Sequence, residues 1–348
     1  MNNISFLILI EAIAIFAIAH LLMPLNIRLS MRLGIIAHPN ERRIHKTSIP
    51  EAGALCFAIP IIIFQATFGW LSGNSAMGRM LFQLSLVGIL ALLLGLWDDR
   101  FESRARLKLL WQLSLAVIMY FIGYRVLYLT NPLGEHFILG WLAFPVTVFW
   151  YLIVFNAINL IDGLDGLASG ISIIVCAVLL TVGIKEQNEL VIALSSFLIA
   201  GNAAFLRYNF FPARIFLGET GALFIGLNIA AISTAGSSQF KGITTMTMMI
   251  PLTALAVPLL DVVLAVFRRL RVGNIFKADK AHIHHTMLAF GFSQMTISII
   301  VYIVTLLFGL IAIGFSFSSK KILFSVLLGL LALMVILAYI FMRQEKKK

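Results

Sequence analysis

Long apolar runs are the feature that most constrains how this chain can fold. A helix needs about 20 mostly apolar residues to cross the roughly 30 Å hydrocarbon core of a bilayer. The runs of this kind are too long for strands and lack two-residue alternation, which argues against a β-barrel. Eleven of them lie near residues 5–24, 52–71, 79–97, 109–129, 137–155, 167–183, 190–206, 220–235, 243–264, 297–317 and 322–341. We therefore expect an all-α polytopic membrane protein with about eleven transmembrane helices, forming a single domain over residues 1–348.

The overall composition agrees with a chain that lies in a bilayer. Hydrophobic residues make up 61% of it and charged residues 12%, whereas soluble domains average about 45–50% and about 25%. These values exclude a soluble enzyme, a disordered chain and a fibrous protein. The net charge of +11 would also suit nucleic acid. Because the basic residues lie in short segments between apolar runs, we expect a membrane and no nucleic-acid partner.

The charged residues predict the orientation of the chain. With the N-terminus outside, 20 of the 26 Lys and Arg residues fall in cytoplasmic segments, as the positive-inside rule requires. The C-terminus is then cytoplasmic. Eleven of the 15 acidic residues lie in or beside the same segments. A carboxylate at the end of a span is costly unless it is paired, hydrated or bound to a metal, so we expect the chemistry at this cytoplasmic boundary.

The third span ends in the sequence GLWDDR, which places Asp98 beside Asp99. Adjacent carboxylates repel each other unless a cation or a basic partner screens them. They could hold Mg²⁺ on a diphosphate, or act as a base or nucleophile at the membrane surface. The alternative is a solvated loop in which they pair with the arginines that follow.

The fifth span runs into a stretch where Asn156, Asn159, Asp162 and Asp165 recur at every third residue. Two glycines in the same stretch indicate that the helix opens here, so that backbone and side chains can converge. Polar contact between packed helices is the alternative.

Two later segments add further candidates. Residues 207–221 place Glu219 at the start of a span, where a carboxylate serves as a helix cap or a metal ligand. Phe216, three residues earlier, would stack on a planar base or belong to the core. The longest cytoplasmic segment carries three histidines within residues 282–285. Phosphate binding or proton transfer suits them better than structural zinc, and a solvated polar loop is the alternative.

Five cytoplasmic segments thus bring carboxylates, amides, an aromatic ring, histidines and cations to one membrane face. Carboxylates repel a diphosphate unless a divalent cation bridges them, and Mg²⁺ favours oxygen ligands together with substrate phosphates. The combination predicts phosphoryl transfer between a water-soluble nucleotide compound and a lipid. The expected cofactor is Mg²⁺, with Mn²⁺ as a substitute.

Four motifs, taken jointly, carry a family resemblance. They are GLWDDR (95–100), NAINLIDGLDGLASG (156–170), YNFFPARIFLGETG (208–221) and AHIHH (281–285). Over nearly its whole length the chain resembles the polyprenyl-phosphate N-acetylhexosamine-1-phosphate transferases of glycosyltransferase family 4. The H-I-H-H form and the eleventh span resemble the WecA and TagO branch more than the related MraY enzymes.

The resemblance implies a reaction and its setting. N-acetylhexosamine-1-phosphate, in particular GlcNAc-1-phosphate, would pass from a UDP-sugar to polyprenyl (undecaprenyl) phosphate, giving a polyprenyl diphosphate sugar and UMP. The setting would be the cytoplasmic (inner) membrane of a bacterium. There the reaction would initiate a cell-surface polysaccharide such as lipopolysaccharide O-antigen or teichoic acid. A homodimer is a further expectation.

The resemblance also implies roles for individual residues. Catalytic roles fall to Asp98, Asp99, Asp162, His282, His284 and His285. Substrate contacts fall to Lys46, Lys108, Asn156, Asp165, Asn209, Phe216 and Arg268. The Mg²⁺ ligands would be Asn159, Asp162 and Glu219. A covalent aspartyl intermediate and direct attack by the lipid phosphate are both compatible with this pattern.

Two regions depart from the family pattern. Glu219 stands where the family has Asp, and one extra methylene moves the carboxylate by about 1.5 Å, which matters for strict Mg²⁺ geometry. In the first cytoplasmic loop, His38 replaces an Asp and residues 51–54 replace a Gly-Gly-containing stretch. We therefore expect differences in metal affinity, rate, sugar choice or nucleotide binding.

Two other classes of membrane protein fit less well. Intramembrane prenyltransferases of the UbiA type need two facing Asp-rich motifs, and the second is missing at the required spacing. Transporters place polar groups near the middle of the membrane on broken helices, whereas here they gather at one interface.

Overall fold

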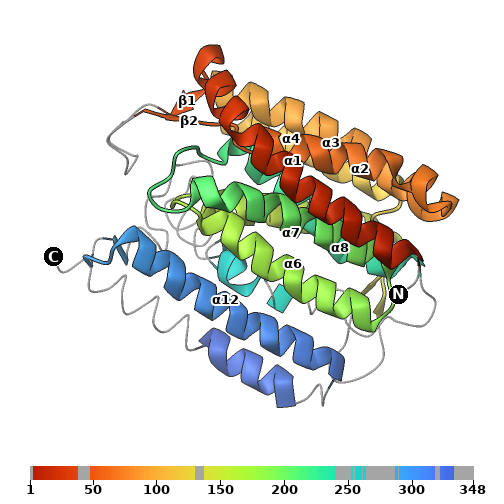
Figure 1. Cartoon of the computed structure of the whole chain (residues 1–348). Coiled ribbons are helices and arrows are strands. Elements are labelled where there is room, and N and C mark those ends of the chain that lie inside the picture. Colours follow the sequence, from red (N-terminus) through yellow and green to blue (C-terminus); the bar gives the residue numbers. More distant parts are fainter. Residues whose placement is uncertain are drawn as a thin grey trace.

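The computed structural model describes residues 3–37, 48–129, 137–239, 252–253, 255–260, 262–263, 287–288, 290–317 and 322–332. Over these ranges the chain is a bundle of helices with two very short hairpins (Figure 1). The helices are α1 (Asn3–Leu33), α2 (Leu55–Ser72), α3 (Ser75–Phe101), α4 (Ala105–Phe121), η1 (Gly140–Leu142), α5 (Ala143–Ile161), α6 (Leu167–Lys185), α7 (Glu189–Asn209), α8 (Gly218–Gln239) and α12 (Gln294–Phe317). The strands are β1 (Ile36–Ala37), β2 (Ile49–Pro50), β3 (Tyr128–Leu129) and β4 (Phe137–Ile138).

The prediction of an all-α polytopic membrane protein is confirmed. Within the described residues, seven helical segments are long and apolar enough to cross a membrane: α1, α2, α3, η1 with α5, α6, α7 and α12. The fourth and eighth expected spans correspond to helices outside this set of seven. They are α4, which has 17 residues and a length of about 26 Å, and α8, which runs through the middle of the bundle. A helix over Ile322–Ala332 begins the eleventh expected span, and most of the ninth lies outside the described residues. The orientation of the termini stays a prediction.

The expected limits of the fourth and fifth spans need correction. Helix α4 ends at Phe121 rather than near residue 129, because Gly123 takes a φ of 102° and turns the chain. The chain then forms β3, which pairs antiparallel with β4. The next helical segment begins at Gly140 and continues to Ile161 instead of stopping near residue 155. Apolar composition alone did not separate this hairpin from the spans beside it.

Helix α8 occupies the centre of the bundle, where it packs on α2, α3, α5, α6 and α7. Its middle is buried all round, including Phe224, Ile225 and Leu227, each fully covered. A helix that is hydrophobic on every side belongs in an interior. Glycine allows the tightest of these approaches, since a side-chain carbon at Gly95 of α3 would overlap the backbone of Thr220 in α8.

The outer surface of the bundle is apolar, as a bilayer requires. Large exposed side chains occur along the helices, and Trp70 and Trp141 are 90% and 81% exposed. Trp70 lies near the end of α2 and Trp141 lies in η1, just after the β3–β4 hairpin, and amphipathic rings at helix ends suit a membrane interface. The titratable residues of the motifs lie at the opposite helix ends, where α3, α5 and α7 finish and α4, α6 and α8 begin.

Candidate active site

Asp99 fixes the start of α8. Its Oδ1 accepts the backbone N–H of Glu219 at 2.7 Å, and its Oδ2 accepts the backbone N–H of Thr220 at 3.1 Å and the Thr220 hydroxyl at 2.5 Å. The first N–H groups of a helix lack partners within the helix, and a carboxylate is favoured at its positive end. Gly218 has a φ of 75°, and a side-chain carbon there would come within 2.6 Å of Asp99 Oδ2. Asp99 therefore acts as the N-terminal cap of α8.

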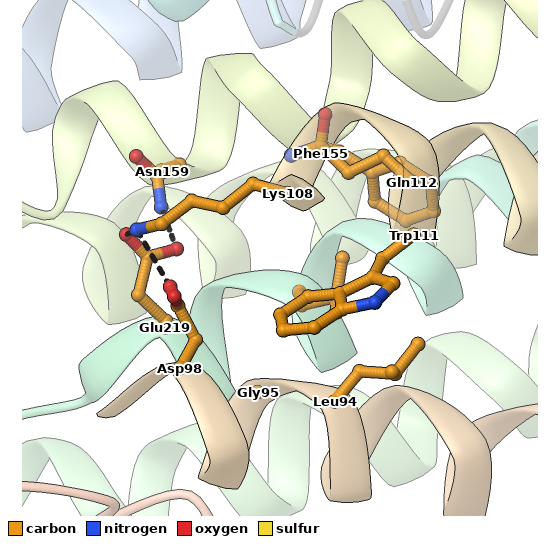
Figure 2. A pocket seen from close by; sticks show the side chains of 10 residues that line it. Leu94, Gly95, Asp98, Lys108, Trp111, Gln112, Phe155, Asn159 and Glu219 are labelled. Carbon is orange, nitrogen blue, oxygen red and sulfur yellow. Dashed lines mark hydrogen bonds and ion pairs between the residues drawn. The ribbon is translucent and has the colours of Figure 1, made fainter. Parts of the chain in front are cut away.

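A second set of side chains, which we call the Lys108 cluster, consists of Asp98, Lys108, Asn159 and Glu219. The ammonium of Lys108 lies 2.6 Å from Asp98 Oδ2 and 2.8 Å from Glu219 Oε1. Asn159 donates from its amide nitrogen to Glu219 Oε2. Figure 2 shows the four side chains meeting from α3, α4, α5 and α8.

The Lys108 cluster is held rigidly on the side of α3. Asp98 is only 4% exposed, and its Oδ1 also accepts the backbone N–H of Ser103 at 2.8 Å. The helix ends just beyond it, where Glu102 takes a left-handed conformation with a φ of 47°. Burial by itself would lower the pKa of Lys108, but attraction from Glu219 and Asp98 outweighs burial and raises that pKa above its ordinary value. Lys108 is therefore a fixed positive charge.

A pocket continues from the Lys108 cluster between α3, α4, α5 and α8. One end of it is polar, and the other is formed by the side chains of Leu94, Trp111, Phe155 and Leu223. Figure 2 shows the indole of Trp111 lying across the apolar end. Gln112, which also lines the pocket, accepts the side-chain amide of Asn156 at 3.0 Å, and the same amide donates to the Leu152 carbonyl at 2.7 Å. The site thus joins a charged end to an apolar one.

Asp162 lies where α5 stops, as the C-cap residue of that helix. Burial, followed by repulsion from Glu219, Asp99, Glu51 and Asp165, raises its pKa well above the ordinary value. These acids come from four separate parts of the chain. The expected convergence of carboxylates at one end of the bundle is therefore visible in the electrostatics of Asp162.

The residues that follow Asp162 form a turn over residues 162–166, which we call the Gly166 turn. Asp165 Oδ2 accepts the backbone N–H of Ala213 at 2.9 Å. Asn209 accepts the Gly166 N–H through Oδ1 at 3.1 Å and donates through Nδ2 to the Ile215 carbonyl at 2.9 Å. The predicted opening of the helix at the glycines is confirmed, because α5 ends at Ile161 and α6 begins at Leu167. Asp165 and Asn209 both bind the backbone in this arrangement.

Phe216 joins the loop before α8 to the loop before α2. Its backbone N–H donates to the Pro50 carbonyl at 2.9 Å, and its carbonyl accepts the Gly53 N–H at 2.9 Å. A side-chain carbon at Gly53 would overlap the ring of Phe205, so a glycine is required at this crossing. The ring of Phe216 is half-buried.

The remaining predicted site residues lie outside the described ranges. They are Lys46, Arg268, His282, His284 and His285.

The residues at hand suit a hard divalent cation by their chemistry. Carboxylate and amide oxygens are the ligands that Mg²⁺ takes, and the crowding of acids around Asp162 is the repulsion that such a cation would relieve. Across the described ranges, however, no three acidic, histidine or cysteine side chains converge closely enough to hold one ion. In this arrangement the positive charge beside Asp98 and Glu219 is the ammonium of Lys108.

Sequence reasoning gave no role to several residues that shape the site. Thr220 completes the cap made with Asp99, and Trp111 and Gln112 line the pocket. Helical spacing could have predicted Trp111 and Gln112, because they lie one turn beyond Lys108 and therefore on the same face of that helix. Tyr302 of α12, which contacts the Gly166 turn, had no signal in the sequence.

Comparison with known proteins identifies the family. Residues 81–237, which span Asp98 to Glu219, match glycosyl transferase family 4. A relative from Bacillus subtilis (strain 168), described as a probable undecaprenyl-phosphate N-acetylglucosaminyl 1-phosphate transferase, is 35% identical over 292 residues, covering 83% of this chain and 80% of the relative. The chain belongs to glycosyl transferase family 4.

Other relatives of this family 4 protein carry similar descriptions. A decaprenyl-phosphate N-acetylglucosaminephosphotransferase from Mycobacterium leprae (strain TN) is 30% identical over 323 residues, covering 82% of this chain and 77% of the relative. An undecaprenyl-phosphate alpha-N-acetylglucosaminyl 1-phosphate transferase from Escherichia coli (strain K12) is 28% identical over 309 residues, covering 82% and 77%. The family expected from the motifs is confirmed, and family 4 membership argues against the prenyltransferase and transporter alternatives.

Proposed function

We propose that this family 4 protein transfers N-acetylglucosamine-1-phosphate from a UDP-sugar to polyprenyl phosphate. An oxygen of the lipid phosphate would attack the sugar-bearing phosphorus, and the bond to the bridging oxygen of the diphosphate would break. The products are a polyprenyl diphosphate sugar and UMP. The observation that carries the proposal is the Lys108 cluster opening onto an apolar pocket, together with relatives described by the same transfer.

Lys108 would bind a phosphate of one of the two substrates. Its ammonium is already positioned by two carboxylates from different helices. Binding of substrate therefore does not have to fix the orientation of this side chain. Preorganised charge of this kind is the main source of catalysis in phosphoryl transfer. The apolar end of the pocket, with Trp111, would receive the adjoining part of the lipid.

The acids would fall into two roles. Asp98 and Glu219 keep Lys108 in place, and Asp99 keeps the start of α8, and with it Glu219, beside the pocket. We propose Asn159, Asp162 and Glu219 as the residues that would hold Mg²⁺, or Mn²⁺ in its place. The ion would offset the negative charge of the diphosphate.

The nucleotide would bind beside the Gly166 turn. There Asp165 and Asn209 hold the loop that carries Phe216, whose half-buried ring would stack on the uracil. Lys46, Arg268 and the histidines at 282, 284 and 285 are further proposed contacts with the diphosphate and sugar, argued from the sequence alone.

We further propose that the site faces the cytoplasm in a bacterial inner membrane and that the product begins a cell-surface polysaccharide, such as O-antigen or teichoic acid. Homodimer formation is also proposed. The side of the membrane can be tested with single cysteines placed at Lys185 and at Arg343 in intact cells. We expect a membrane-impermeant reagent to label position 185 and not position 343, and the reverse pattern would invert the topology.

The reaction is tested by UMP release from purified protein in lipid nanodiscs. We expect release from UDP-GlcNAc only when polyprenyl phosphate and Mg²⁺ are both present. Omission of the lipid and chelation of the metal are the controls, and a panel of UDP-sugars defines the donor. Absence of UMP with every donor would contradict the proposed function, whereas release without lipid would indicate hydrolysis instead of transfer.

A further inference from the structure

A tyrosine far from the motifs contacts the Gly166 turn. The hydroxyl of Tyr302, on α12, donates to the Gly166 carbonyl at 2.6 Å across 136 positions of the sequence. The same carbonyl also accepts the N–H of Gly170 at 2.9 Å, within the first turn of α6. The peptide N–H of Gly166 is bound by Asn209. Gly166 is thus held through both of its backbone polar groups.

The Tyr302 ring fits against α6 because of a glycine. A side-chain carbon at Gly170 would overlap the ring of Tyr302, so any larger residue would displace α12 or the ring. Helix α12 packs along α6 (Figure 1). Tyr302 lies eight positions after the start of α12, so about 12 Å of that helix precedes the contact and the rest follows it. The contact therefore belongs to a close helix–helix crossing directly under the turn.

The turn that Tyr302 holds carries two of the candidate acids. Asp165 precedes Gly166 directly, and Asp162 is four positions away, at the end of α5. Asp165 in turn binds the backbone of Ala213, in the loop that leads to Phe216. A shift of the Gly166 peptide would therefore move groups on both sides of the proposed nucleotide site.

We propose that Tyr302 is a positioning residue of the transferase, which holds Asp162 and Asp165 in place through the Gly166 carbonyl. This inference rests on the proposed function. The hydroxyl is not needed to form α6, because Gly166 O keeps its bond from Gly170 when the hydroxyl is absent. What the hydroxyl adds is a restraint from α12 on the orientation of the turn.

The test is Tyr302→Phe, which keeps the ring against Gly170 and removes only the hydroxyl. Tyr124→Phe is the matched control, since the Tyr124 hydroxyl also donates to a backbone carbonyl, that of Met80 at 3.1 Å, at the other end of the bundle. We expect Tyr302→Phe to lower kcat about five-fold or more, the equivalent of one hydrogen bond, with the KM for polyprenyl phosphate unchanged. Tyr124→Phe should leave both constants unchanged.

Backbone hydrogen exchange provides a reading that needs no substrate. We expect the amides of residues 162–170 to exchange faster in Tyr302→Phe than in the unaltered protein, and no faster in Tyr124→Phe. Gly170→Ala, which would displace the ring or α12, should speed the exchange of these amides at least as much as Tyr302→Phe.

The outcomes separate this inference from the proposed function. Equal kcat values for the two Tyr→Phe variants, with a transferase that releases UMP normally, would overturn the positioning role of Tyr302. Unchanged exchange at residues 162–170 in Tyr302→Phe would overturn it as well, even in a protein that transfers no sugar phosphate. A failure of the unaltered protein to release UMP would instead overturn the proposed function.

Discussion

The Lys108 cluster and the Gly166 turn both contain acids and amides from the same motifs, but they use them differently. In the cluster, Asp98 and Glu219 share the ammonium of Lys108 and border a pocket, although Asp98 also accepts the backbone N–H of Ser103 with its other oxygen. At the turn, Asp165 and Asn209 bind backbone groups of neighbouring loops. The first arrangement leaves charge facing a space, whereas the second fixes the path of the chain.

This difference distinguishes groups available for chemistry from groups that shape the site. When a carboxylate that accepts backbone N–H groups is replaced, those N–H groups lose their partner and the local fold is destabilised. When a carboxylate that holds the Lys108 ammonium is replaced, the main effect is on the position of that charge at the pocket. Asp99, which accepts two N–H groups of α8, resembles the turn in this respect, although it is the neighbour of Asp98.

The largest expected effect comes from Lys108→Met, which keeps most of the length of the unbranched side chain and removes its charge. Asp98, buried at 4% exposure, would lose its cation, and the pocket would lose the positive charge that we propose binds phosphate. We expect kcat/KM for UMP release to fall about 100-fold. Lys185→Met is the control, since Lys185 pairs at 3.8 Å with Glu186 at the other end of the bundle. If the Lys108→Met variant kept half of the activity, the Lys108 cluster would have no important role in the reaction.

Asn209→Ala tests the structural role of the turn. The buried Gly166 N–H and the Ile215 carbonyl would both lose a partner, and we expect the free energy of unfolding to fall by about 2 kcal/mol, measured by thermal unfolding in detergent. Asn188→Ala, at the other end of α7, removes the cap bond to the Val191 N–H. It should lower stability without changing activity per folded molecule. If Asn209→Ala lowers activity at unchanged stability, Asn209 contacts substrate directly.

Glu219→Asp sharpens the account of the Lys108 cluster. Shortening the side chain by about 1.5 Å should separate its carboxylate from Lys108 or from Asn159, because the two lie on opposite oxygens. We expect kcat to change about ten-fold and the Mg²⁺ concentration for half-maximal activity to shift. Glu102→Asp, an exposed position beside the same site, is the control. An unchanged Mg²⁺ titration would remove Glu219 from the proposed metal ligands.

The smallest expected effect is a pH dependence of stability that originates at Asp162. Its pKa is raised by burial and by neighbouring acids, so the folded state binds a proton that the unfolded state has released. Stability is therefore lost as pH rises from the ordinary pKa of an aspartate, about 3.9, towards the raised value.

Asp162→Asn abolishes this loss. In EDTA we expect the variant to be more stable than the unaltered protein at pH 8 and to approach it near pH 4, as measured by thermal unfolding. Added Mg²⁺ should stabilise only the unaltered protein. Equal curves for the two proteins at every pH would show that neither burial nor the neighbouring acids raise the pKa of Asp162.

Several features of the site were predictable because their signals are local. Adjacent acids in GLWDDR and glycines after Asp162 indicated where α3 and α5 end, and charged residues at the limits of apolar runs indicated a site at one end of the bundle. The β3–β4 hairpin was missed because its residues are as apolar as the spans beside it. The separate roles of Asp98 and Asp99 were also missed, since neighbours on a helix differ in direction by about 100° and sequence does not say what each one faces.

The sequence by itself determined that this chain spans a membrane, that its spans are helical, and that its polar motifs lie at helix ends, because apolar length and charge act within each segment. Only the tertiary structure decided which polar groups meet. Lys108 reaches Glu219 across 111 positions and Tyr302 reaches Gly166 across 136. Such pairs depend on how closely helices cross, which glycines at Gly95 and Gly170 allow, and no periodicity within one helix records the helix that will lie against it.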